Sequence, residues 1–168
     1  MQNDFKMACQ RLNEYLEHGT ATTETDLYQF TSKKKYSKNE LVEFERAYNL
    51  TLPEEYIYFL LNVGASTIYI DEFGLGVEFC LLNELESFFN SVFLGMEKVF
   101  PKLLIIGSIQ GRGDVFGFDL REGNVGTIFS TFCSEEDPET WLTQTYSWST
   151  FSRWLCRLVA SDAEDDLV

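Results

Sequence analysis

The sequence predicts a single domain of the α+β class, with a central, mainly antiparallel sheet of about five to six strands packed by helices. Helix-like segments begin and end the chain, and most strand-like segments are grouped between them instead of alternating regularly with helices. A length of 168 residues with 45% hydrophobic residues suits one core of ordinary size. We expect this domain to cover residues 1–160, with an N-terminal helix and arm at 1–36 and a core at 37–160.

The first expected helix covers residues 5–17, where apolar residues recur at helical spacing. His18 is the sole histidine of the chain and comes at the end of this pattern, so we interpret it as a partner of the helix terminus and not as a catalyst. Residues 20–35 are polar and contain the run Lys33-Lys34-Lys35. We interpret them as a solvated linker or irregular arm.

Two more helices are expected in the next part of the chain. Ser37 and Glu40 have the spacing of a capping box, in which each side chain accepts a hydrogen bond from the backbone of the other residue. The apolar stripe that follows ends at Asn49. Pro53 opens the third helix, where its missing N–H is harmless, and Gly64 ends it.

The rest of the sequence contains some segments with the spacing of a helix and others with the period of two that is typical of a strand. In order, they are a hairpin of strands at 67–73 and 77–82, a helix at 83–98, strands at 103–109, 114–120 and 125–129, a loop at 134–139 and a helix at 149–159. Gly111 and Gly113 match no phosphate-binding motif, and we interpret them as a tight turn between two strands. Residues 161–168 form an acidic tail that we expect to be flexible.

The net charge of −14 argues against nucleic acid as a ligand, because phosphate binding requires a basic surface. The charge is unevenly distributed, since no Lys or Arg occurs between Ala47 and Glu97. No apolar run is long enough to span a bilayer, and the first residues lack the apolar core of a signal peptide. We therefore expect a cytoplasmic protein that binds neither nucleic acid nor a membrane.

The residues that usually carry catalysis do not form a recognisable pattern. Cys9, Cys80, Cys133 and Cys156 are widely spaced and lie among large apolar residues, so we interpret them as reduced structural thiols. No metal-binding or cofactor-binding motif is present, and we expect no metal, no cofactor and no enzymatic activity. An enzyme with an unrecognised site is a third hypothesis beside the two given below, and it would use Cys80 or a carboxylate with a strongly perturbed pKa.

Three stretches of the sequence share their order and spacing with a known superfamily. They are ELVEFERAYNLTLPEEYIYFLLNVG, then GRGDVFGFDL followed by GNVGTIF, and finally YSWSTFSRWLCRLV. The matching positions are Phe44-Glu45, Leu52-Pro53, Tyr56, Phe59-Leu60, Gly113-Asp114, Ser149, Phe151 and Leu155. On these residues the chain resembles the SUKH superfamily, over a region that runs from about Glu40 to Val159.

The resemblance implies an α+β binding protein. The superfamily includes bacterial immunity proteins, which neutralise cognate toxins that are often nucleases or deaminases, and the yeast cell-wall synthesis regulators. The first hypothesis is an intracellular immunity protein that binds one basic toxin domain, as a monomer or a weak homodimer. The alternative is a non-catalytic regulatory or scaffold protein that binds endogenous partners.

A basic toxin would be attracted to the acids in the segment that lacks Lys and Arg. The acids expected to contact the partner are Glu54, Glu55, Asp71, Glu72, Glu78, Glu84 and Glu86. Trp141, Tyr146 and Trp148 are expected as aromatic anchors of the same interface.

Overall fold

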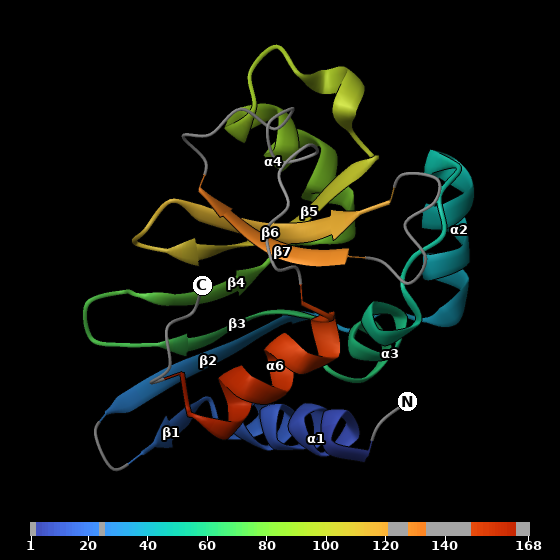
Figure 1. The fold of residues 1–168 in the computed structure, drawn as a ribbon. Helices are drawn as coiled ribbons and strands as arrows, with labels where there is room; N and C mark the ends of the chain where they lie inside the picture. Colours follow the sequence, from blue (N-terminus) through green and yellow to red (C-terminus); the bar gives the residue numbers. More distant parts are fainter. Residues whose placement is uncertain (1–2, 24–25, 121–127, 134–148, 164–168) are drawn as a thin grey trace.

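The structure of the chain is a computed structural model that describes residues 3–23, 26–120, 128–133 and 149–163. Its centre is a seven-stranded sheet in which each strand pairs antiparallel with the next one along the chain (Figure 1). The strands are β1 (Thr20–Thr22), β2 (Leu27–Lys34), β3 (Ala65–Ile70), β4 (Gly76–Phe79), β5 (Leu103–Gln110), β6 (Asp114–Asp119) and β7 (Ile128–Cys133). The predicted α+β class with an antiparallel sheet is confirmed.

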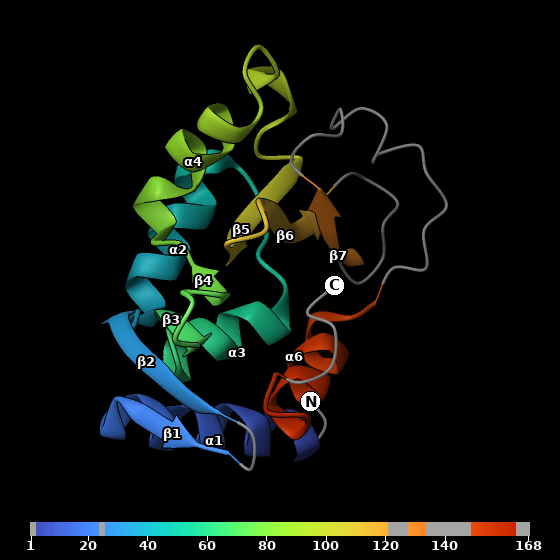
Figure 2. The same cartoon turned by 90° about the vertical axis from the view of Figure 1, so that its left-hand side faces the viewer.

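Helices cover both faces of the sheet. They are α1 (Asn3–His18), α2 (Lys38–Tyr48), α3 (Glu54–Asn62), α4 (Leu85–Val92) and α6 (Phe151–Ala160), with short 3-10 helices η1 (Leu82–Glu84) and η2 (Glu97–Val99). The ribbon shows α1 and α6 side by side at the lower end of the molecule, where α1 also contacts β1 and β2, while α4 lies at the opposite end (Figures 1 and 2).

The sheet has more strands than expected because residues 20–35 are not a linker or irregular arm. Thr20–Thr22 and Leu27–Lys34 form β1 and β2, and β2 pairs with β3. Tyr28 and Phe30 are buried on one side of β2, and the residues beside them face solvent. Only two residues of this strand contribute to the core, so its polar majority concealed the period of two in the sequence.

Two further boundaries differ from expectation. The expected helix at 83–98 is divided into η1, α4 and η2, because the backbone leaves the helical region at Phe93 (φ −120°, ψ 72°) and again at Gly95 (φ 85°). The last strand continues to Cys133, beyond the expected end at residue 129, while its expected first residues, 125–127, lie outside the described residues. The expected loop at 134–139 also lies outside the described residues.

Several local predictions are confirmed. The capping box of α2 is present, with the Ser37 hydroxyl accepting from the backbone N–H of Glu40, and α2 ends at Asn49 in the left-handed conformation. The ring Nδ1 of His18 lies 2.6 Å from the carbonyl oxygen of Glu14, as expected for a residue that closes a helix end. Gly111 and Gly113 both have positive φ in the turn between β5 and β6.

The two faces of the sheet bury separate apolar clusters. Phe116 and Phe118 of β6 point into the main core, which also contains the buried residues of α1, α3 and α6. Val115 of β6 points the other way, into a smaller cluster with Phe89 and Phe93 from the α4 segment. This alternation along one strand is the period of two that fixes which helices cover which face.

The acidic tail begins with a packed turn. The Arg11 guanidinium donates two hydrogen bonds of 2.9 Å to the Asp162 carboxylate, which also accepts from the hydroxyls of Tyr15 and Tyr69. Residues 161–163 were expected to be part of a flexible tail, but these bonds link the end of α6 to α1 and β3. Residues 164–168 lie outside the described part of the chain.

Candidate functional site

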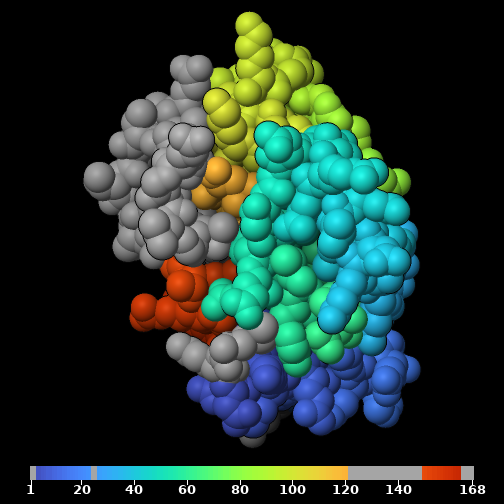
Figure 3. Space-filling view, turned by 90° about the vertical axis from the view of Figure 1, so that its right-hand side faces the viewer, coloured from blue at the N-terminus to red at the C-terminus, as the bar shows by residue number. Residues whose placement is uncertain are grey.

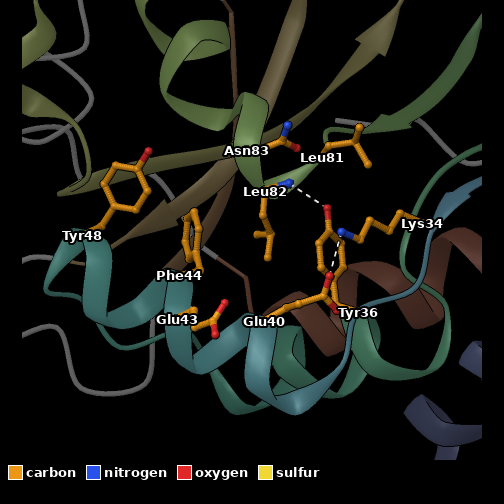
Figure 4. Close-up of a pocket in the computed structure, with 9 residues that line it drawn as sticks. All are labelled: Lys34, Tyr36, Glu40, Glu43, Phe44, Tyr48, Leu81, Leu82 and Asn83. Carbon is orange, nitrogen blue, oxygen red and sulfur yellow. Dashed lines mark hydrogen bonds and ion pairs between the residues drawn. The ribbon is translucent and has the colours of Figure 1, made fainter.

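A pocket of about 630 Å³ lies between α2 and the segment that connects β4 to α4 (Figure 4). We call it the α2 pocket, and its lining residues are Lys34, Tyr36, Glu40, Glu43, Phe44, Tyr48, Leu81, Leu82 and Asn83. In the space-filling view, α2 lies at the molecular surface between α1 at the bottom and the α4 segment at the upper edge (Figure 3). Lys34, Glu43 and Asn83 of the pocket lining are exposed, so another protein can reach the pocket.

Glu40 is held rigidly in this pocket by bonds to both of its carboxylate oxygens. Oε2 accepts from the backbone N–H and the hydroxyl of Ser37, each at 2.8 Å, and Oε1 lies 2.7 Å from the Lys34 Nζ. The hydrogen bond from Lys34 and those from Ser37 lower the pKa of Glu40 to about 2. The carboxylate is thus ionised over the physiological range and is already fully engaged by its own chain.

Tyr36 forms the inner wall beside Glu40. Its hydroxyl accepts a hydrogen bond of 2.8 Å from the backbone N–H of Leu82, which joins β2 to the connection that leads to α4. The Lys34 Nζ lies 5.0 Å from the centre of the Tyr36 ring, within the range of a cation–π interaction. Burial raises the pKa of Tyr36, so its hydroxyl stays neutral.

The opposite end of the pocket combines two rings with acids that form no ion pair with any residue in the described part of the chain. The Phe44 and Tyr48 rings pack with their centres 4.9 Å apart, and the Tyr48 hydroxyl donates to the Glu86 carboxylate at 3.0 Å. Glu43 lies next to Phe44 on the exposed rim. Within the described part of the chain, the ion pairs are Arg11–Asp162, Lys33–Glu78 and Lys34–Glu40, and none of them involves Glu43 or Glu86.

The seven acids predicted to contact a partner are distributed over the molecule instead of forming one patch. Asp71 and Glu72 lie in the turn between β3 and β4, at the left of Figure 1, whereas Glu54 and Glu55 begin α3 at the right. Glu78 lies in β4. Only Glu84 and Glu86 are beside the α2 pocket, at the start of α4.

Three of these acids are engaged in bonds that hold the fold together. Glu55 accepts from the backbone N–H and the hydroxyl of Ser152 at the start of α6, at 3.0 and 2.6 Å. Asp71 accepts from two backbone N–H groups of its own turn. Glu78 pairs with Lys33 and accepts a hydrogen bond of 2.8 Å from Gln110. Burial acts to raise the pKa of Glu78, but the bonds from Lys33 and Gln110 have the larger effect, so the pKa is lowered.

The other predicted contact residues divide into two groups. Glu54, Glu72, Glu84 and Glu86 are exposed, so their carboxylates face solvent. Trp141, Tyr146 and Trp148 lie outside the described residues, and their role as anchors stays a prediction.

Sequence reasoning missed the residues that form the α2 pocket. Glu40 was identified only as a helix cap, Tyr48 only as part of the apolar stripe that follows it, and Phe44 as part of that stripe and of the motif Phe44-Glu45. The signal was the spacing of Glu40, Phe44 and Tyr48, which are four residues apart and so lie on one face of α2. What the sequence did not show is that the connection from β4 to α4 packs opposite this face.

The chemistry of Cys9 and Cys80 agrees with their interpretation as structural thiols. Burial raises the pKa of Cys9 and of Cys80 to about 12, which disfavours the thiolate that a nucleophile or metal ligand requires. Over the residues that the structure describes, no cluster of His, Cys, Asp and Glu is arranged to bind a metal ion. In the same part of the chain, no helix has the length and apolarity to cross a membrane.

Comparison with known proteins assigns the chain to a family. The chain is 33% identical over 133 residues, which are 79% of each protein, to "Immunity protein RhsIB" of Dickeya dadantii (strain 3937). Residues 35–157 match the SMI1 / KNR4 family (SUKH-1), a region that includes all of the α2 pocket except Lys34. The resemblance inferred from sequence motifs is confirmed, and the chain belongs to the SMI1 / KNR4 family (SUKH-1).

Proposed function

We propose that this chain is an immunity protein that acts in the cytoplasm by binding and neutralising a cognate toxin domain. The observation that carries the proposal is the 33% identity, over most of both chains, to a protein named as an immunity protein. In this role the chain is a binder and needs neither a catalytic residue nor a cofactor.

The charge of the molecule supports a basic toxin as the partner. A toxin that acts on nucleic acid, such as a nuclease or a deaminase, requires a positive surface to hold phosphates. A net charge of −14 would attract such a protein over a distance and raise the rate of association. The same charge would repel nucleic acid, so the chain would compete with nucleic acid for the basic surface of the toxin without itself binding nucleic acid.

The α2 pocket and the acids at the start of α4 are the surface that we propose for the contact. Glu84 and Glu86 are exposed there, and Glu43 lies on the rim of the pocket. Glu54 and Glu72 are also exposed but lie on other parts of the surface. We expect these two to contribute to long-range attraction and less to the bound state.

The test first looks for a toxin domain encoded beside this chain's gene and then expresses that domain in cells with and without the chain. We expect growth only when the chain is present, and a complex of the two purified proteins whose affinity falls as salt is raised from about 50 to about 500 mM. A toxin that kills in the presence of a folded, equally abundant chain, together with no complex by calorimetry at low salt, would refute the immunity role.

The alternative, a regulatory scaffold, is compatible with the same family. The family is named after SMI1 and KNR4, and its match alone does not separate a scaffold from an immunity protein. The two differ in the consequence of deleting the gene. An immunity protein becomes dispensable once the toxin gene is also deleted, whereas a scaffold leaves the same growth or morphology defect in both strains.

A further inference from the structure

We infer that the α2 pocket receives the guanidinium group of one arginine side chain of the partner protein. This inference rests on the proposed function only for the identity of the partner. The chemistry of the recognised group comes from the pocket itself.

One end of the pocket already holds a cation from the chain's own sequence. The ammonium group of Lys34 lies over the Tyr36 ring, 5.0 Å from its centre, and 2.7 Å from a carboxylate oxygen of Glu40 (Figure 4). An aromatic face and a carboxylate together bind a positive group at this end. The pocket is thus built from groups that hold cations.

The other end repeats this combination without a cation. Glu43 carries the carboxylate, and Phe44 and Tyr48 carry the aromatic faces, with ring centres 4.9 Å apart. Glu86 adds a second carboxylate, which is fixed by the hydrogen bond from the Tyr48 hydroxyl. The lining contains one cationic residue, Lys34, and Glu40 engages it, so no positive charge of the lining opposes a cation at this end.

Arginine fits this end of the pocket better than lysine does. A guanidinium group is planar, so it can stack on a ring face while it donates two parallel hydrogen bonds to one carboxylate. Its weaker hydration also lowers the cost of entering a pocket with apolar walls such as Leu82 and Phe44. A carboxylate on an exposed rim forms a weak ion pair in water, but the pair strengthens when the partner's surface covers it.

The first test uses the chain alone and needs no toxin. N-acetyl-L-arginine amide is titrated into the protein and the ring signals of Phe44 and Tyr48 are followed by NMR, with N-acetyl-L-lysine amide as the matched probe. We expect the arginine probe to shift both ring signals with saturation and to bind more tightly than the lysine probe. Equal binding of both probes, or shifts at other aromatic residues only, would overturn the inference.

The second test uses the toxin domain and the variant Glu43→Gln, which keeps the size of the side chain and removes its charge. We expect the dissociation constant to increase about 10- to 100-fold. The matched control is Glu17→Gln on the exposed side of α1, for which we expect an unchanged constant. Circular dichroism of both variants shows whether they fold.

The two tests separate the inference from the proposed function. If the toxin binds with the same affinity to the wild-type chain and to a folded Glu43→Gln variant, the arginine inference is wrong and the immunity role stands. If no toxin binds to the wild-type chain, the immunity role fails, and the arginine probe alone decides whether the pocket recognises guanidinium.

Discussion

The turn between β3 and β4 and the α2 pocket are both acidic, but their carboxylates have different partners. In the turn, the Asp71 carboxylate accepts from the backbone N–H groups of Phe73 at 2.9 Å and Leu75 at 2.8 Å. In the pocket, Glu40 is engaged in the same way by Ser37 and Lys34, but Glu43 forms no ion pair with any described residue. Local charge therefore does not separate acids that stabilise the fold from acids that stay available to a partner, whereas the bonds of each carboxylate do.

The largest expected effect on stability comes from a substitution at Gly64, which packs against the backbone of the pocket residue Lys34. Gly64 has φ of +87°, and a Cβ atom there would lie 2.2 Å from the backbone oxygen of Lys34. Gly64→Ala should therefore lower the free energy of unfolding by about 2–4 kcal/mol, through backbone strain and displacement of the strand end that carries Lys34. Urea unfolding measures this loss.

Gly74 provides the control for this substitution. It also has positive φ, but no atom lies within 4 Å of the position that a Cβ would occupy there. Gly74→Ala should cost less than Gly64→Ala, since it adds strain without a clash. Equal losses for the two variants would show that the contact with Lys34 does not matter.

A smaller effect is expected in the β3–β4 turn. Asp71→Ala removes the acceptor of two backbone N–H groups and should lower the free energy of unfolding by about 1–3 kcal/mol. Glu72→Ala, on the exposed neighbouring residue, should change it by less than about 0.5 kcal/mol. Thermal or urea unfolding of the pair checks the difference, and similar losses would remove the distinction between engaged and free acids.

The smallest effect concerns the pH dependence of stability. Because the hydrogen bonds from Lys34 and Ser37 hold the pKa of Glu40 at about 2, below its ordinary value of 4.5, the ionised carboxylate stabilises the folded state. This contribution is fully present above pH 4.5 and is lost as the pH falls toward 2. The wild-type chain should thus be more stable than Glu40→Gln above pH 4.5, and this difference in the free energy of unfolding should decrease as the pH falls from 4.5 toward 2.

A series of urea unfolding experiments at about pH 6, 4 and 3 measures that difference. Glu43→Gln serves as the comparison in the same pocket, and its stability difference from the wild-type chain should be small at each pH because Glu43 has no ion pair within the described part of the fold. A difference for Glu40→Gln that stays constant across the series would contradict the bonding described for Glu40.

The sequence predicted the elements with strong local signals and missed those that depend on distant contacts. The spacing of Ser37 and Glu40 correctly located the start of α2, because a capping box involves neighbours along the chain. The strand β2 was missed because its polar face outweighs Tyr28 and Phe30, and pairing with β3 decides its structure. The pattern of residues within β2 cannot predict its pairing with β3, which lies about 30 residues later in the sequence.

The same limit applies to the candidate site. The net negative charge and the absence of Lys and Arg from Ala47 to Glu97 were evident from the sequence. The sequence did not show that Glu55 and Asp71 are used within the fold, nor that Tyr36 meets Leu82, which is 46 residues away. The pocket arises from that long-range contact, so no spacing rule along α2 could predict it.

We propose that a basic toxin binds to the α2 pocket and to Glu84 and Glu86 beside it. The most direct test is the dissociation constant of the toxin domain for two variants of equal net charge. One variant is Glu43→Lys with Glu84→Lys and Glu86→Lys, and the other is Glu14→Lys with Glu17→Lys and Asp26→Lys, three exposed acids away from the pocket.

We expect the pocket variant to bind more than about 100-fold more weakly than the wild-type chain, because like charges would meet in the contact. The second variant should lose less than about tenfold, through weaker long-range attraction alone. Equal losses in both variants, or full affinity in the pocket variant, would contradict the claim.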